Sequence, residues 1–343
     1  MQLRYTSEEI LASHECASPH VVAGYRLHGG FDEAGDYRPP RTLRRLEAVE
    51  NWRQALRDRG GEPLEIGLDL LAGPRYPNFE QHKLLLEEGL GETLWNSLTN
   101  IGRTEARGAF IATITPPPFE EIVDEDVAEM TLGHLQPLFV AHGADEGGIP
   151  SKGIGGHDQM WFAARDLAFG KERYPLPPPQ APGAQQQRVG QRWMPDLPAP
   201  HAELLRSLMG LLMIEIRAFV GFQQNEQLLR DPELFRDRRE EADEAADIVA
   251  RIRSDERVHV AYLCNMFGEL RHATLRCSDG SRKPGAKIID PAWQKQVHLS
   301  KVVMPKQQRA AMRAVVHERI GRHASGERLL GEFEALCDPG ATE

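Results

Sequence analysis

The chain has 343 residues, enough for one large domain or two domains of ordinary size. Its composition, 41% hydrophobic and 27% charged, is typical of a folded globular protein and not of a disordered one. A formal net charge of -10 at pH 7 leaves no basic surface to attract nucleic acid or an anionic membrane. We therefore expect neither of these partners.

The cysteines and the N-terminus indicate the compartment. The four cysteines are scattered and form no Cys-x-x-Cys pair, which argues against disulfides and thiolate zinc sites and favours a reducing environment. The first residues carry acids and a histidine where a signal peptide needs an apolar run. The most apolar stretch, residues 204–222, is interrupted by Arg206, Glu215 and Arg217, so we expect a buried helix there and no membrane span. These features predict a soluble, cytoplasmic protein.

Helical periodicity dominates from residue 42 onward, and strand signals are sparse, so the sequence predicts an all-α fold. Thr42 is the expected cap of the first long helix, and Pro137 is expected to kink the fourth. Residues 1–40, the Gly-rich residues 143–156 and the Pro- and Gln-rich residues 174–200 are expected to be irregular. Helices are expected at about 42–58, 79–88, 92–108, 120–142, 157–169, 200–230, 238–273, 306–323 and 326–337.

The chain is expected to form a single helical domain over residues 1–343. Within it, residues 1–88 are an N-terminal extension, residues 89–273 a metal-binding bundle and residues 274–343 a C-terminal extension.

Glu215 is the first candidate for chemistry. It lies in the middle of the apolar side of helix 200–230, and its neighbours three and four residues away are all apolar. A buried carboxylate is costly unless it is paired, hydrogen-bonded or bound to a metal. A salt bridge to a core Arg or His is the alternative to a metal site.

The next helix contains Glu256 and His259, three residues apart on one face and bracketed by apolar residues. This spacing lets a carboxylate and an imidazole reach one ion from adjacent turns. If the two helices fold back near residue 234, Glu215 and Glu256 lie within roughly one turn of the same height. A second Glu-x-x-His match, Glu269 with His272, is expected to be a solvated helix end.

The preceding half of the chain offers weaker candidates. Glu105 continues the apolar stripe of helix 92–108, and His134 continues the stripe of helix 120–142. Glu129 and Asp126 could supply a carboxylate beside His134. The Gly-rich residues 143–156 favour a flexible loop over a phosphate-binding loop, and this loop could act as a lid because it delivers two further candidate ligands, His157 and Asp158. For each of these residues the alternative is a core histidine or a solvated acid.

This arrangement resembles the ferritin-like di-iron carboxylate proteins, whose four helices provide Glu, Glu-x-x-His, Glu and Glu-x-x-His. Glu215 matches the second lone carboxylate, Glu256 with His259 matches the second pair, and Glu105 matches the first lone carboxylate. The resemblance implies a ferritin-like helical bundle, here with extra N- and C-terminal helices and long loops.

The first pair departs from that pattern, because three residues before His134 stands Thr131 and not an acid. The number of metal ions, one or two, therefore stays open. The identity of the acid that would ligate a second ion stays open as well.

The resemblance implies an oxygen-activating enzyme, an oxidase or oxygenase that takes O2 and a small organic substrate. Iron is the expected metal, as two ions if the first half completes the site, and manganese is the alternative. A non-catalytic metal-binding protein and a helical interaction protein are the other interpretations, and association into a homo-oligomer stays open. The expected ligands are Glu105, Glu129, His134, Glu215, Glu256 and His259.

Overall fold

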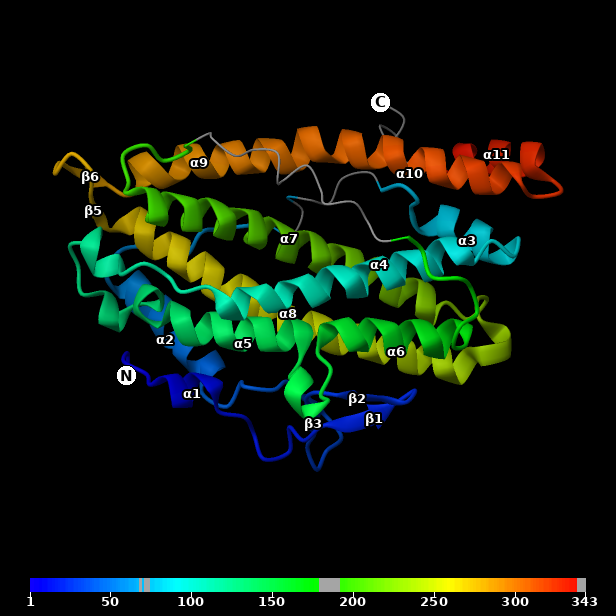
Figure 1. The fold of residues 1–343 in the computed structure, drawn as a ribbon, viewed down its shortest axis with the longest axis horizontal. Helices are drawn as coiled ribbons and strands as arrows, with labels where there is room; N and C mark the ends of the chain where they lie inside the picture. Colours follow the sequence, from blue (N-terminus) through cyan, green and yellow to red (C-terminus); the bar gives the residue numbers. More distant parts are fainter. Residues whose placement is uncertain (68–69, 71–74, 179–191, 338–343) are drawn as a thin grey trace.

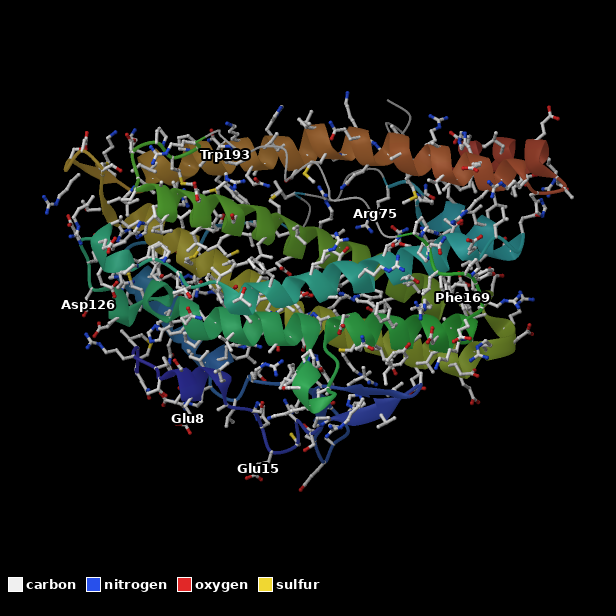
Figure 2. All side chains as sticks on the ribbon, in the orientation of Figure 1. Glu8, Glu15, Arg75, Asp126, Phe169 and Trp193 are labelled. Atoms are coloured by element: carbon white, nitrogen blue, oxygen red, sulfur yellow. The ribbon has the colours of Figure 1, made fainter. Side chains whose placement is uncertain are left out.

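Four long helical segments lie side by side in the computed structural model, which describes residues 1–67, 70, 75–178 and 192–337 (Figure 1). They are α4 (Glu92–Gly108), α5 (Leu135–Gly147) followed by α6 (His157–Phe169), α7 (Ala199–Arg230) and α8 (Arg239–His272). Apolar side chains from all of them form two buried clusters, and side chains fill the space between the helices (Figure 2). The prediction of a mainly helical chain is confirmed.

The second of these segments is one helical line broken in the middle, since α5 and α6 follow each other end to end (Figure 1). α5 ends at Gly147, and Gly148 takes a φ of +68°, a conformation that glycine adopts without strain. A short 3-10 turn, Pro150–Lys152, fills the connection, and α6 begins directly at His157.

The expected helix at 120–142 is wrong in its first half. The chain there forms three 3-10 turns, Phe119–Glu121, Val127–Glu129 and Thr131–His134, before α5 starts at Leu135. Pro137 consequently occupies the first turn of α5. A proline costs little at that position because the first N–H groups of a helix have no partner inside the helix. Pro137 therefore lies at the start of a helix and does not kink one.

The α7–α8 hairpin is held by Arg239 at the start of α8. Its guanidinium donates to the backbone carbonyls of Leu229, Asp231 and Leu234, which lie at the end of α7 and in the turn. These carbonyls lack partners inside the helix, so a cation placed among them stabilises the helix end. The hairpin brings the middle of α7 beside the middle of α8.

The N-terminal segment covers one side of the four helical segments. It contains α1 (Ser7–Leu11), the hairpins β1 (His20–Val22) with β2 (Tyr25–Leu27) and β3 (Gly30–Phe31) with β4 (Tyr37–Arg38), and α2 (Arg45–Asp58). The short strands were not expected from the sequence. Thr42 does not cap α2, because its hydroxyl donates to the Pro39 carbonyl and the helix begins three residues later.

The C-terminal segment runs along the outer side of α7 (Figure 1). It comprises the hairpin β5 (Thr274–Arg276) with β6 (Arg282–Pro284), α9 (Ala286–His298), the π-helical turn Leu299–Val303, α10 (Met304–Gly321) and α11 (Gly326–Ala335). The sequence did not predict α9, whose pattern contains Pro291. Asn78 and Gln81 lie at the start of α3 (Phe79–Glu87). Their side-chain amides donate to backbone carbonyls at the end of α11 and so hold the C-terminal segment in place.

No helix of the described residues combines the length and the apolar character that a bilayer span requires. The expected loop at 174–200 lies partly outside the described residues, and the remainder contains no helix before Ala199.

Candidate metal centre

Seven buried side chains of the types that can ligate a metal meet between the four helical segments. They form two groups that share one residue, Glu146, and within each group the candidate ligand atoms lie within 4.8 Å of one another. Each residue is at most 8% exposed. They are Glu105 of α4, His142 and Glu146 of α5, His157 of α6, Glu215 of α7, and Glu256 and His259 of α8.

The first group, here position 1, is His142, Glu146, Glu215 and His259. His142 Nε2 lies 3.4 Å from Glu215 Oε1 and 3.6 Å from Glu146 Oε1. From the opposite helix, His259 Nδ1 lies 3.5 Å from Glu146 Oε1 and 3.8 Å from Glu215 Oε2. Two imidazole nitrogens therefore face the same pair of carboxylates.

The second group, here position 2, is Glu105, Glu146, His157 and Glu256. His157 Nδ1 lies 3.1 Å from Glu256 Oε1, 3.4 Å from Glu146 Oε1 and 3.7 Å from Glu105 Oε2. Glu146 belongs to both positions. Glu256 also reaches both, because its other oxygen lies 2.8 Å from His259 Nδ1.

Four of these atoms are buried without a hydrogen-bond partner: His142 Nε2, Glu146 Oε1, His157 Nδ1 and Glu256 Oε1. A buried polar atom left unpaired costs about 1–3 kcal/mol, so a folded protein rarely tolerates several in one place. Their convergence fits metal coordination, in which each lone pair is directed at a common ion and not at a neighbouring side chain. The mixed carboxylate and imidazole donors suit Fe, Mn or Zn.

The buried carboxylates of the cluster also repel one another. Burial, together with the neighbouring Glu105 and Glu256 carboxylates, raises the pKa of Glu146 well above its ordinary value. Burial also opposes ionisation of Glu256, but His259 and His157 outweigh it and lower the pKa of Glu256 to about 2. Cations among these carboxylates would relieve the repulsion that otherwise retains a proton on Glu146.

Two aspartates orient the histidines crosswise. Asp145, beside Glu146 on α5, accepts from Nε2 of His259 on α8 at 3.1 Å. Asp255, beside Glu256 on α8, lies 3.2 Å from Nε2 of His157 on α6. Each aspartate accepts from Nε2 and so turns Nδ1 towards the carboxylates of the cluster, as outer carboxylates do for metal-bound histidines. Burial opposes protonation of His157 and His259, but the neighbouring carboxylates outweigh it and raise the pKa of both well above its ordinary value.

The N-terminal segment fixes both aspartates. Arg41 and Arg45 pair with Asp145, and although burial opposes its ionisation, these two guanidinium groups hold the pKa of Asp145 well below its usual range. On the other side, His28 Nε2 and the Tyr37 hydroxyl lie 3.4 Å and 3.3 Å from Asp255 Oδ2. Residues 28–45 therefore position both histidines through the aspartates.

Of the ligands predicted from the sequence, Glu105, Glu215, Glu256 and His259 come together, whereas Glu129 and His134 do not. Glu129 is half-exposed and pairs with Arg4 at 3.6 Å, near Asp126 at one end of the molecule (Figure 2). Both ring nitrogens of His134 are engaged with backbone atoms, of Tyr5 and Met130. Because residues 120–134 contain 3-10 turns and no α-helix, the helical stripe that was expected to present His134 does not exist.

Two other expectations about single residues change. Asp158 accepts from the backbone N–H groups of Gly156 and Gln159 and does not join the cluster, unlike its neighbour His157. Glu269 is buried and not solvated, and it accepts from the Thr131 and Leu132 backbone. Burial outweighs these hydrogen bonds and raises the pKa of Glu269 to about 7.

Sequence reasoning missed His142 and Glu146. Glu146 and His157 stand eleven positions apart in the chain, but the loop 148–156 brings them to one position as if they were a Glu-x-x-His pair. The Asp-Glu dipeptide of Asp145-Glu146 recurs at Asp255-Glu256, but it also occurs at residues 32–33, 124–125 and 243–244, so it does not single out the cluster.

Tyr262 lies against the cluster, and Trp161 packs in the apolar core. The Tyr262 hydroxyl is 2.9 Å from His142 Nδ1, so the nitrogen of His142 that remains is the one facing position 1. Trp161 contacts Phe222 edge to face at a centroid distance of 4.6 Å.

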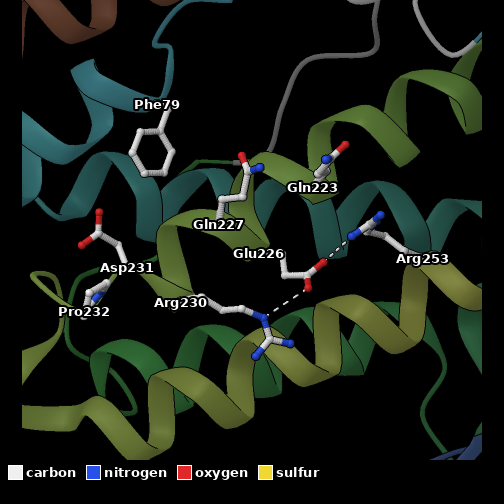
Figure 3. Close-up of a pocket in the computed structure, with 8 residues that line it drawn as sticks. All are labelled: Phe79, Gln223, Glu226, Gln227, Arg230, Asp231, Pro232 and Arg253. Atoms are coloured by element: carbon white, nitrogen blue, oxygen red, sulfur yellow. Dashed lines mark hydrogen bonds and ion pairs between the residues drawn. The ribbon is translucent and has the colours of Figure 1, made fainter.

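The cavities that we describe lie elsewhere. One of about 340 Å³ opens at the α7–α8 end beside α3, where Glu226 bridges Arg230 and Arg253 (Figure 3). The other, of about 60 Å³, lies beside Glu269. Neither is lined by a residue of the metal cluster.

Comparisons with known protein families, with curated proteins and with solved structures give no match.

Proposed function

We propose that this protein holds a di-metal centre, with iron as its metal, and uses it as an oxidase or oxygenase. The observation that supports this most is the convergence of four unpartnered, buried donor atoms from α5, α6 and α8. Glu105 and Glu215 are lone glutamates on two helices, and α8 supplies Glu256 with His259. The α5–α6 segment supplies Glu146 with His157 and, in addition, His142. Apart from His142, this is the donor pattern of the ferritin-like di-iron carboxylate proteins.

The chain's own residues would perform several tasks. Glu146 and Glu256 face both positions and would hold two ions at a fixed separation. Asp145 and Asp255 accept from Nε2 of His259 and His157, so Nδ1 is the nitrogen of each ring that would bind an ion after losing its proton. The burial of all seven ligands excludes bulk water. Bound iron would supply electrons and open coordination positions for O2.

Oxygen uptake tests the catalytic part of this proposal. Metal-free protein is loaded with Fe(II) under anaerobic conditions, O2 is added, and its consumption is followed with an electrode. We expect uptake faster than that of free Fe(II), and we expect Glu146→Gln to abolish the difference because this residue serves both positions. Glu129→Gln, at a half-exposed acid away from the cluster, is the matched control and should behave as the wild type. Equal uptake in Glu146→Gln and wild type would exclude the proposed centre.

A non-catalytic metal-binding protein is a second candidate, because both described cavities avoid the buried cluster and so offer it no adjoining substrate space. Turnover separates the two functions. A reductant is added after the first uptake has ended: a catalyst accepts its electrons and consumes O2 again over many cycles, whereas in a binding protein the buried Fe(III) is not re-reduced and uptake does not resume.

A further inference from the structure

A third group of buried ligand atoms lies beside the metal cluster and shares His157 with it. The group consists of His28, His157 and Asp255, whose candidate ligand atoms lie within 4.8 Å of one another. None of these residues is more than 3% exposed. His28 lies between β2 and β3, whereas His157 begins α6 and Asp255 belongs to α8. The group therefore joins the N-terminal segment to two of the four helical segments.

Three side-chain atoms of this group are buried without a hydrogen-bond partner. They are Nδ1 and Nε2 of His28 and Oδ1 of Asp255. A folded protein rarely leaves several such atoms unpaired in one place. Nε2 of His28 faces Asp255 but does not form a hydrogen bond with it, so its lone pair is available to an ion.

The separations within the group match a tetrahedral metal site. Asp255 Oδ2 lies 3.4 Å from His28 Nε2 and 3.2 Å from His157 Nε2. With metal–ligand bonds of about 2.0–2.1 Å, the ligand atoms of a tetrahedral site lie about 3.3–3.4 Å apart. The rings of His28 and His157 are inclined by 83° with centroids 5.6 Å apart, so they are not stacked. An ion beside the carboxylate can therefore lie in the plane of both rings.

Tyr37 brings a further oxygen to this place. Its hydroxyl lies 3.3 Å from Asp255 Oδ2. A Cβ added at Gly29 would collide with this hydroxyl, so the glycine next to His28 allows the phenol to approach. Two imidazoles, a carboxylate and one more oxygen form a donor set typical of four-coordinate zinc.

We infer that His28, His157 and Asp255 bind a Zn(II) ion that fastens the N-terminal segment to α6 and α8. This site does not depend on the proposed di-metal centre, because it uses Nε2 of His157 whereas position 2 uses Nδ1. The ion takes the place of the proton that Nε2 of His157 shares with Asp255, and that proton leaves to solvent. When position 2 is filled as well, His157 loses both ring protons and bridges the two ions as an imidazolate.

The amount and the location of bound zinc test this inference. Metal-free protein is incubated with Zn(II), passed through a gel-filtration column that contains a weak chelator, and analysed by plasma mass spectrometry. Zinc suits the donors of positions 1 and 2 as well, so the wild type should retain about three ions per chain. An anomalous map of the crystallised protein at the zinc edge should place one of these ions between His28 and Asp255.

Two variants assign the third ion to His28. His28→Phe keeps a flat ring but removes both nitrogens, so it should retain one zinc ion fewer than the wild type and keep the ions at positions 1 and 2. His20→Phe is the matched control, because His20 is a partly buried histidine of the same segment that does not belong to the group. It should retain as much zinc as the wild type.

The outcomes separate this site from the di-metal centre. Zinc at positions 1 and 2 of the wild type but not between His28 and Asp255 would overturn the inference and leave the centre intact. Equal zinc contents in His28→Phe and wild type would overturn it as well. Zinc at the third site alone would support the inference and contradict the di-metal centre. Should His28→Phe fail to fold, the wild-type map still decides the inference.

Discussion

Asp145 offers a sharp test of how the N-terminal segment supports the centre. Its carboxylate is fully buried, accepts from His259 and pairs with both Arg41 and Arg45. Asp145→Asn keeps the shape of the side chain but removes its charge. Two guanidinium groups, one of them only 1% exposed, then face a neutral amide in the core.

The expected loss of stability follows from this burial. Breaking a buried charge pair by neutralising one partner costs about 3–5 kcal/mol of unfolding free energy, because the remaining charge stays desolvated. The amide also no longer favours a proton on Nε2 of His259, so metal affinity should fall by about 10–100-fold. Asp126→Asn is a matched control at the exposed pair with Arg4, and it should cost less than about 1 kcal/mol.

Urea unfolding with chelator present measures the first effect, and competition against a metal indicator measures the second. If Asp145→Asn and Asp126→Asn lose the same stability and bind metal equally well, the proposed support of His259 by Asp145 is refuted. A stability loss without a change in metal affinity would separate the fold from the site and refute only the orienting role.

Three further predictions concern other parts of the chain. Because burial raises the Glu269 pKa from 4.5 to about 7, its contribution to stability is complete below pH 4.5 and is lost as pH rises through 7. Between pH 5 and 8 this costs up to about 3 kcal/mol in urea unfolding, and Glu269→Gln should flatten the profile, so an unchanged profile contradicts the assignment. His157→Gln should lose bound metal, whereas His134→Gln should retain it; plasma mass spectrometry measures both, and the reverse order would reinstate the sequence-based assignment. Gly148→Ala should lower the melting temperature more than Gly153→Ala, since both glycines have positive φ but only Gly148 is enclosed, with an added Cβ 2.2 Å from the Ile154 carbonyl oxygen. Equal shifts would mean that the loop between α5 and α6 relaxes freely.

Local sequence patterns predicted much of the helical structure because the long helices carry their own start and stop signals. Residues 92–108 and 157–169 were predicted with the bounds that the structure shows, since apolar periodicity ends at glycine in both. The start of α5 could not be placed in the same way. Nothing local distinguishes a helix with a kink at Pro137 from one that begins two residues earlier.

Part of the candidate site could be predicted from local sequence, and part depends on contacts between distant residues. Glu256 and His259 lie one turn apart, so their shared face follows from helix geometry alone. Glu146 and His157 meet only because loop 148–156 folds back and bonds to the β2 segment, where Gly155 N–H donates to the Arg26 carbonyl. Such a contact depends on tertiary structure, and no helical spacing predicts it.

Metal content tests the central claim most directly. Protein loaded anaerobically with Fe(II) and freed of excess metal should contain about two ions per chain, and His259→Ala should lose most of this metal. Fewer than about one ion per chain in the wild type, or unchanged content in His259→Ala, would contradict a di-metal centre built on this cluster.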